Sequence, residues 1–367
     1  MANKNLTNAK KAKNDEFYTQ FSDIQKEVES YLEYDPNTFK GKVVYSNCDD
    51  PFESNFFRYF VLNFDKLGLK QIITTSYKPS PVANTQLGLF GDDKTLTKSK
   101  GRPKITANKF IINEVGDVDG DGSFTLEDIA KQLRTNKNNE WTPFEGEGDF
   151  RSAECVELLK QSDIVVTNPP FSLFREYITQ LFEYKKQFLI IGNLNAITYK
   201  EVFPMIKKNK VWFGPSISSG DREFVVPHYI FKEIGNWRTD EKGIHYARVM
   251  GVRWYTNLDH GRRHQPLNLM RMADNLKFNK KMQGKKSYDK YDNYDAIDVP
   301  YVGAIPSDYD GIMGVPINFM DKYSSEQFEI LGANRGVDQD PDGIYGRSTY
   351  VNGKETFKKL FIRRKKK

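Results

Sequence analysis

The tetrapeptide Asn168-Pro169-Pro170-Phe171 places side chains of distinct chemistry next to one another. Proline fixes its own φ and restricts the preceding residue to extended backbone, so the Asn168 amide and the Pro169 carbonyl are held in one rigid arrangement. Both oxygens can accept hydrogen bonds from a single exocyclic amino group, and Phe171 offers a flat face on which a planar ring can stack. The tetrapeptide is therefore suited to bind a planar, amino-bearing group such as the N6 edge of adenine.

The same arrangement can assist a reaction at that amino group. The N6 nitrogen of adenine is a poor nucleophile because its lone pair is delocalised into the ring. Two acceptors placed tetrahedrally about it favour the sp3-like nitrogen of a transition state over the flat ground state. The tetrapeptide directly follows the apolar run 164–167, and open α/β sheets bind ligands at the carboxyl ends of their strands. This position favours a catalytic role over a plain Pro-Pro turn.

Two other segments carry candidates for binding a nucleoside cofactor beside the tetrapeptide. Asp149 can accept from an adenine amino group, and Phe150 can stack on the ring. Asn47, Asp49 and Asp50 follow the first predicted strand, which is where a doubly wound sheet holds its cofactor loop. The glycine-rich turn expected there is missing, and the second strand does not end in an acidic residue. The residues alone therefore only suggest a cofactor site.

The elements around these residues alternate between strand and helix. Predicted strands lie at 42–46, 71–75, 163–167 and 188–191, and predicted helices at 54–65, 152–161 and 172–184, the last capped by Ser172. Such alternation predicts an α/β fold with a doubly wound, mostly parallel sheet of the Rossmann-like type. Residues 211–213 and 223–226 are expected to form an antiparallel pair that closes the sheet, with 214–222 between them as a mobile lid.

Composition shifts divide the 367 residues into parts. We expect a flexible basic arm at 1–13, a catalytic domain at 14–232, a recognition region at 233–357 and a basic tail at 358–367. Residues 78–147 interrupt the catalytic domain as an insertion that contains a short apolar strand at 110–112, in a predicted hairpin.

The positive charge is concentrated in three places. The formal net charge is +6, yet the two chain ends alone hold eleven Lys and Arg residues, so the remainder is acidic. The exception is 253–286, where nine cations stand against two acids with aromatic residues interleaved. Basic side chains beside aromatic ones suit a phosphate backbone and unstacked bases, so we favour a polyanionic partner over solubilising tails. The candidate contacts in this stretch are Arg253, Arg262, Arg263, Lys280, Lys281, Lys285 and Lys286.

Several classes of protein do not fit the sequence. No apolar run approaches the length of a membrane span, and the N-terminus has no apolar core of a secretory signal. Cys48 and Cys155 cannot form a disulfide scaffold, and the histidines show no metal-binding spacing, so we expect a cytoplasmic protein without a metal. Residues 117–128 resemble a calcium loop, but a predicted strand precedes them and Asp128 replaces the terminal glutamate, which favours an acidic hairpin turn.

The chain also resembles the EcoRI-type adenine-specific DNA methyltransferases. The matching stretches are DEFYTQ (15–20), VVYSNCDDP (43–51), NFDKLGLK (63–70), GDFRS (148–152), SDIVVTNPPFSLF (162–174), ITYKEVF (197–203), YDNYDAI (291–297) and MGVPI (313–317). The resemblance implies S-adenosylmethionine as methyl donor, double-stranded DNA as partner and a flipped adenine as target. It implies the catalytic set Asn168, Pro169, Pro170 and Phe171, and the cofactor set Tyr18, Thr19, Asn47, Asp49, Asp50, Asp149, Phe150 and Asn168.

The resemblance further implies a methyltransferase fold with a C-terminal recognition region, in a monomer, and it leaves a cognate restriction nuclease open. GAATTC, which the EcoRI type methylates, would be the first DNA site to test. Two alternatives remain open. The same tetrapeptide serves methyltransferases that act on RNA guanine N2 or on protein glutamine, and the chain could be a catalytically idle DNA-binding relic of the fold.

Overall fold

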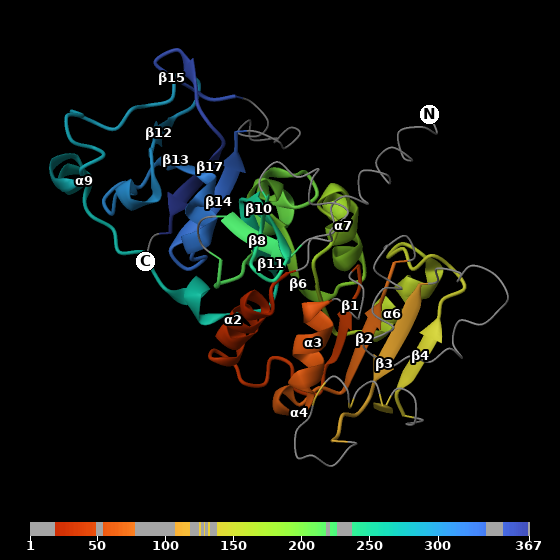
Figure 1. The fold of residues 1–367 in the computed structure, drawn as a ribbon. Coiled ribbons are helices and arrows are strands. Elements are labelled where there is room, and N and C mark those ends of the chain that lie inside the picture. The colour runs from red at the N-terminus through yellow and green to blue at the C-terminus, as the bar shows by residue number, and fades with distance from the viewer. Residues whose placement is uncertain are drawn as a thin grey trace, which may run out of the picture. The chain divides into compact units, whose positions relative to one another are not determined.

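The computed structural model describes residues 19–48, 54–77, 107–117, 125, 128, 131–132, 138–217, 221–225, 237–334 and 348–365 (Figure 1). The chain divides into two compact units. Unit 1 comprises residues 1–192 and 220–258, and unit 2 comprises 193–219 and 259–367. This division differs from the predicted boundary at 232, because a segment before that boundary belongs to unit 2 and a segment after it belongs to unit 1.

Unit 1 is built on a large, mostly parallel sheet within a mixed α/β fold. Its strands follow the order β4-β3-β2-β1-β5-β6-β11. They are β1 (Val43–Ser46), β2 (Gln71–Thr75), β3 (Asn108–Ile112), β4 (Glu140–Pro143), β5 (Ile164–Thr167), β6 (Gln187–Asn193) and β11 (Val252–Thr256). β1 pairs in parallel with both β2 and β5, and β5 pairs in parallel with β6. The four strands predicted from apolar runs are thus confirmed, since runs of this kind are typical of strands buried on both faces.

The helices of unit 1 connect these strands. They are α2 (Phe21–Leu32), α3 (Asn55–Leu62), α4 (Phe64–Leu67), α6 (Ala153–Gln161) and α7 (Phe174–Glu183). The Ser54 and Ser152 side chains cap α3 and α6 by accepting from a backbone N–H three residues on. Ser172 does not cap α7 as predicted, because it lies inside the 3-10 turn η2 (Phe171–Leu173) and Leu173 precedes the helix.

The insertion extends the sheet at one edge. β3 contains the predicted strand at 110–112 and pairs antiparallel with both β2 and β4. The connection from β3 to β4 lies largely outside the described residues, so the hairpin stays a prediction. The Phe110 ring stacks on Trp141 with ring centroids 5.3 Å apart. Much of the rest of 78–147 lies outside the described residues, including 118–124 of the calcium-like loop. Among the residues that are described, no cluster of His, Cys, Asp and Glu could hold a metal ion.

The predicted antiparallel pair between 211–213 and 223–226 is wrong. β8 (Asp221–Val225) lies in a separate three-stranded sheet of order β8-β10-β9 with β10 (His245–Met250) and β9 (Trp237–Thr239). Its register places Glu223 opposite Arg248 in β10. Two short apolar runs near each other in sequence had looked like partners, but the partner of β8 comes from later in the chain. Of the lid predicted at 214–222, residues 218–220 lie outside the described part.

Unit 2 contains a four-stranded sheet of order β12-β13-β17-β14. Its strands are β12 (Ala296–Asp298), β13 (Ile312–Pro316), β14 (Phe328–Ala333) and β17 (Lys359–Arg364), and β15 (Tyr350–Val351) pairs with β16 (Lys354–Glu355) beside them. The helical segments of this unit are η3 (Leu194–Thr198), α8 (Phe203–Lys207), η5 (Gly261–His264), α9 (Met272–Phe278), η6 (Val302–Ala304) and η7 (Ile317–Lys322), and β7 (Trp212–Phe213) precedes η5.

The prediction of a basic tail at 358–367 needs correction. Most of that segment is β17, which pairs antiparallel with both β13 and β14. Leu360, Phe361 and Ile362 are fully buried there. Lys359 is also buried, where its Nζ lies 2.8 Å from the Asp298 carboxylate and donates to the Val299 carbonyl at 3.0 Å. An apolar triplet inside a run of cations therefore builds the centre of a sheet.

None of the helices in the described residues is both long enough and apolar enough to cross a membrane.

Candidate active site

The carboxyl edge of the unit 1 sheet gathers the residues predicted to do chemistry. The chain runs from β1 to β2 on one side and reaches β5 and β6 on the other, so the strand order reverses at β1. Open α/β sheets bind ligands outside the carboxyl ends of the strands at such a switch point. Asn47 follows β1 and Asn168 follows β5, and β1 and β5 are hydrogen-bonded neighbours.

The tetrapeptide connects β5 to α7 through a tight turn. β5 is buried along its whole length, and Asn168 remains only 7% exposed. Pro170 has φ −55° and ψ 124°, and its carbonyl accepts from the Leu173 N–H at 2.9 Å. Phe171 is half-buried and opens η2. The predicted order of strand, rigid turn and helix is confirmed.

Asn47 is held by two side chains that flank the tetrapeptide in sequence. The Thr167 hydroxyl donates to the Asn47 carbonyl, and the Tyr177 hydroxyl donates to Asn47 Oδ1. Asn47 is only 3% exposed, and both donors are fully buried. Burial raises the pKa of Tyr177 well above its ordinary value, so the phenol keeps its proton and acts as a donor. Cys48, the next residue, has φ +74°.

Two buried hydroxyl groups border the connection from β1 to α3. Thr19 Oγ1 and Ser46 Oγ are both buried without a hydrogen-bond partner in the described part of the protein. The Thr19 carbonyl accepts from Asn55 Nδ2 at 2.8 Å, which fixes this segment at the start of α3. Buried hydroxyls are normally hydrogen-bonded, so these two are candidates for contacts with a polar ligand.

The segment 148–150 lies against the end of β2. Gly148 has φ +73°, and a Cβ there would lie 2.1 Å from the Ser76 carbonyl oxygen, so only glycine fits. Burial alone would raise the pKa of Asp149, but hydrogen bonds from Arg151 outweigh it and hold that pKa below its usual value. The Arg151 guanidinium donates to the carboxylate at 2.8 and 2.9 Å.

Phe150 packs inward. It is buried with its ring edge-on to Tyr177, at 5.0 Å between centroids, and its carbonyl accepts from Gln180 Nε2 at 3.1 Å. The structure thus brings Thr19, Asn47, Asp149, Phe150 and Asn168 to the strand ends and connections of unit 1. Of the other predicted cofactor residues, Tyr18, Asp49 and Asp50 lie outside the described residues. Sequence reasoning missed Tyr177, because it stands in no motif, and it covered Ser46 only as part of the matching stretch 43–51.

The predicted DNA contacts divide into two groups. Arg253 in β11 is 4% exposed and donates to the Val252 carbonyl at 2.8 Å, so it belongs to the core of unit 1. Arg262 donates to the Pro215 carbonyl at 2.6 Å in unit 2. In contrast, Lys280, Lys281, Lys285 and Lys286 are exposed.

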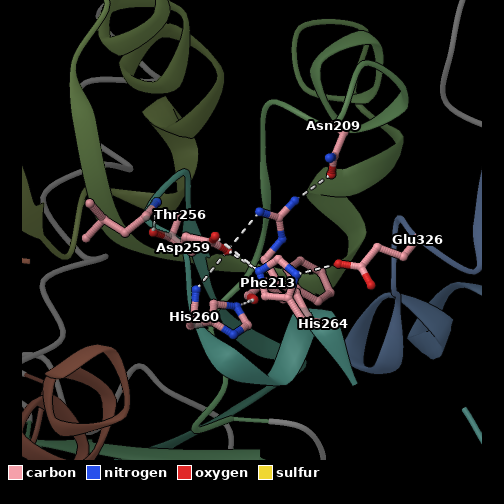
Figure 2. A network of polar contacts seen from close by, with 9 residues as sticks. Asn209, Phe213, Thr256, Asp259, His260, His264 and Glu326 are labelled. Atoms are coloured by element: carbon pink, nitrogen blue, oxygen red, sulfur yellow. Dashed lines mark hydrogen bonds and ion pairs between the residues drawn. The ribbon is translucent and has the colours of Figure 1, made fainter. Parts of the chain in front are cut away.

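Arg263 is part of a polar network around η5. Figure 2 labels its partners Asn209 and Asp259, together with His264 and Glu326. The Arg263 guanidinium donates to Asp259 and to Asn209, both at 2.9 Å, and lies 3.5 Å from the centre of the Trp212 ring. The His264 ring lies between two acidic side chains. Its Nε2 is 2.9 Å from Asp259 Oδ1, and its Nδ1 is 2.7 Å from Glu326 Oε1. This network holds η5 in unit 2. This network could not be predicted from the sequence, because its members come from distant segments.

Exposed lysines lie at the end of α9 and in the residues that follow it, a stretch that we call the α9 surface. It consists of Lys277, Phe278, Lys280, Lys281, Lys285 and Lys286. Phe278 is 61% exposed, and Lys277 lies over its ring at 5.0 Å. The surface is anchored by the buried residues Asn275 and Met282. Cations around an exposed aromatic side chain have the character of a nucleic-acid contact.

The fold and the site define a mixed α/β protein of the methyltransferase kind. The sheet, its switch point and the Asn-Pro-Pro-Phe turn at the end of β5 all agree with that class. The family model described as "Adenine-specific methyltransferase EcoRI" matches residues 5–367, and this chain belongs to that family. The family resemblance read from the sequence is confirmed.

Individual relatives agree with this assignment. The chain is 43% identical to Type II methyltransferase M.EcoRI of Escherichia coli over 350 residues, which cover 95% of this chain and 94% of the relative. It is 35% identical to Type II methyltransferase M.MpnI of Mycoplasma pneumoniae, covering 88% and 83% of the two chains. Type II methyltransferase M.MgeORF184P of Mycoplasma genitalium is 33% identical, with 88% and 84% covered. No solved structure matches the chain significantly.

Proposed function

We propose that this protein transfers the methyl group of S-adenosylmethionine to N6 of an adenine at a specific site in double-stranded DNA. The observation that carries the proposal is the Asn-Pro-Pro-Phe turn at the carboxyl end of β5, beside the end of β1, in a member of the adenine-specific family. Two finer features belong to the same proposal. The sheet is doubly wound in the methyltransferase manner, and the recognition region predicted at 233–357 lies mostly in unit 2, from residue 259 onward.

The residues at the strand ends fit the proposed cofactor. The unpaired hydroxyls of Thr19 and Ser46 are suited to its amino and carboxylate groups, and Phe150 with the ionised Asp149 supplies an apolar and an acceptor group near the end of β2. Tyr18, Asp49 and Asp50 complete the proposed set outside the described residues. When bound, S-adenosylmethionine supplies an electrophilic methyl group on a positively charged sulfur.

The tetrapeptide then acts on the adenine. Asn168 Oδ1 and the Pro169 carbonyl accept hydrogen bonds from the two N6–H groups, and the directions of these bonds favour the tetrahedral nitrogen that forms as N6 attacks. Phe171, which is half-buried at the start of η2, stacks on the purine. The tetrapeptide offers no strong base, so N6 attacks first and loses its proton afterwards.

Duplex DNA hides N6 inside the base stack, so the adenine must be flipped out at a cost of a few kcal/mol. Phosphate contacts from the exposed lysines of the α9 surface offset that cost. Arg253 is not part of this proposed interface, because its guanidinium is buried against the backbone of β11. Arg262 and Arg263 support it indirectly, by holding η5. We propose that the protein acts as a monomer.

The test is transfer of labelled methyl groups from S-adenosylmethionine to duplex DNA containing GAATTC, to structured RNA and to a glutamine-bearing protein. Digestion and mass spectrometry of the products identify the methylated atom. The proposal predicts N6-methyladenine in duplex DNA and no label in the other two substrates. Methylation of guanine N2 or of glutamine would overturn the proposed function in favour of an RNA or protein methyltransferase. Cofactor binding without methyl transfer to any substrate would favour a catalytically idle relic of the fold.

A further inference from the structure

The contacts of Asn47 join two parts of the proposed site that are far apart in sequence. Thr167, the last residue of β5, donates to the Asn47 carbonyl directly before the tetrapeptide begins. Tyr177, on α7, donates to Asn47 Oδ1 shortly after the tetrapeptide ends. The first residue after β1 is therefore held from both sides of the Asn-Pro-Pro-Phe turn.

The backbone at this point needs such support. Cys48 adopts φ +74°, a left-handed conformation that is uncommon for a residue other than glycine. Conformations of this kind persist where the surrounding structure over-determines them, and they cluster at ligand-binding sites. The two hydrogen bonds to Asn47 fix the residue directly before Cys48, so they determine how the chain leaves β1.

Tyr177 also contacts the third segment of the site. Its ring packs edge-on against Phe150, and Gly148 fixes that segment at the end of β2. Because burial keeps the phenol protonated, it remains a hydrogen-bond donor across the neutral pH range. The buried Tyr177 side chain thus contacts two segments of the site, the one that follows β1 and the one that precedes α6.

We propose that Tyr177 and Thr167 are positioning residues that clamp Asn47 and thereby couple the cofactor loop after β1 to the tetrapeptide. This inference rests on the function proposed above and assigns Asn47 a different part in it. Asn47 is expected to keep the loop in position through the hydrogen bonds that its Oδ1 and its carbonyl accept. Groups next to Asn47, rather than Asn47 itself, would then contact the cofactor. The clamp makes the position of the cofactor loop and that of Asn168 dependent on each other.

The clamp is tested by removing each donor without changing the side-chain shape much. Tyr177→Phe removes the hydroxyl donor to the buried Asn47 Oδ1, which keeps only the weak Cys48 thiol donor at 3.6 Å. Thr167→Val removes the hydroxyl donor to the Asn47 carbonyl. We expect each change to weaken equilibrium binding of S-adenosylhomocysteine about tenfold, because the loop then adopts its binding conformation less often in the free protein. We also expect faster hydrogen exchange of the Asn47 and Cys48 amides in the protein without any ligand.

Two matched controls come from unit 1. Tyr31 is fully buried in α2, and its hydroxyl donates to Glu27 Oε1 at 2.8 Å. Thr74 is fully buried in β2, and its hydroxyl makes no hydrogen bond in the described part of the protein. Tyr31→Phe and Thr74→Val should therefore lower the melting temperature at most, with unchanged ligand affinity and unchanged exchange of the loop amides.

The outcomes separate the clamp from the proposed function. Wild-type affinity and wild-type exchange in both Tyr177→Phe and Thr167→Val would overturn the clamp, and so would effects no larger than those of the controls. If the wild-type protein neither binds S-adenosylhomocysteine nor transfers methyl groups, the proposed function fails. In that case hydrogen exchange of the Asn47 and Cys48 amides still tests whether the two hydrogen bonds hold the loop, because that measurement needs no ligand. If Tyr177→Phe does not fold, Thr167→Val alone gives the answer.

Discussion

Removing residues 358–367 should unfold unit 2 rather than trim a flexible tail. The deletion takes away β17, which lies between β13 and β14 and pairs with both. Leu360, Phe361 and Ile362 are fully buried, and burial of one such side chain is worth about 1.5–3 kcal/mol. The three together therefore contribute roughly 5–9 kcal/mol, which is comparable to the entire stability of a typical domain, about 5–15 kcal/mol.

The assay is thermal unfolding by circular dichroism of the full chain and of a chain that ends at Phe357. The truncated chain should lose the unfolding transition of unit 2. A matched control, Arg363→Gln with Lys365→Gln, removes charge but keeps the strand. Arg363 pairs with Glu329 at the surface, so the control should lose about 1 kcal/mol or less. A truncated chain that melts like the full chain, and differs only in salt-dependent DNA binding, would refute the reasoning.

Three further predictions concern other parts of the molecule. Gly148→Ala should cost more than the roughly 1–2 kcal/mol of a left-handed alanine, because its Cβ would lie 2.1 Å from a carbonyl oxygen, and calorimetry should also show weaker cofactor binding. Hydrogen bonding to Glu326 raises the pKa of His264, so the stabilisation it gives is complete below the unfolded pKa of about 6.5 and is lost as pH rises through the folded pKa. His264→Gln should remove that part of the pH dependence of the melting temperature. Lys280→Gln with Lys281→Gln should reduce the slope of log affinity for duplex DNA against log salt by about 2, and an unchanged slope would exclude both as phosphate contacts.

The centre of the unit 1 sheet could be predicted because its signals are local. β1, β2, β5 and β6 are apolar runs, and Ser152 caps a helix from within its own first turn. The tetrapeptide lies where it was expected because a strand and a helix adjoin it directly in sequence. Features of this kind need no knowledge of distant partners.

The rest depends on contacts that sequence spacing does not reveal. The pairing of β8 with β10 requires the register of a distant hairpin. The apolar triplet of β17 was hidden by the seven cations around it, so charge dominated the interpretation. Tyr177 lies 130 residues from Asn47 and stands in no motif, so its contact with Asn47 could not be predicted from the sequence. Arg253 looked like a surface cation, although its strand is buried along its whole length.

Single-turnover methyl transfer by Asn168→Ala, measured together with binding of S-adenosylhomocysteine, tests the role of the tetrapeptide most directly. The tetrapeptide is proposed to hold the adenine amine, so the variant should transfer no methyl group to duplex DNA while it binds the cofactor product nearly as well as the wild-type protein. Methyl transfer at the wild-type rate, or an equal loss of transfer and of cofactor binding, would contradict that role.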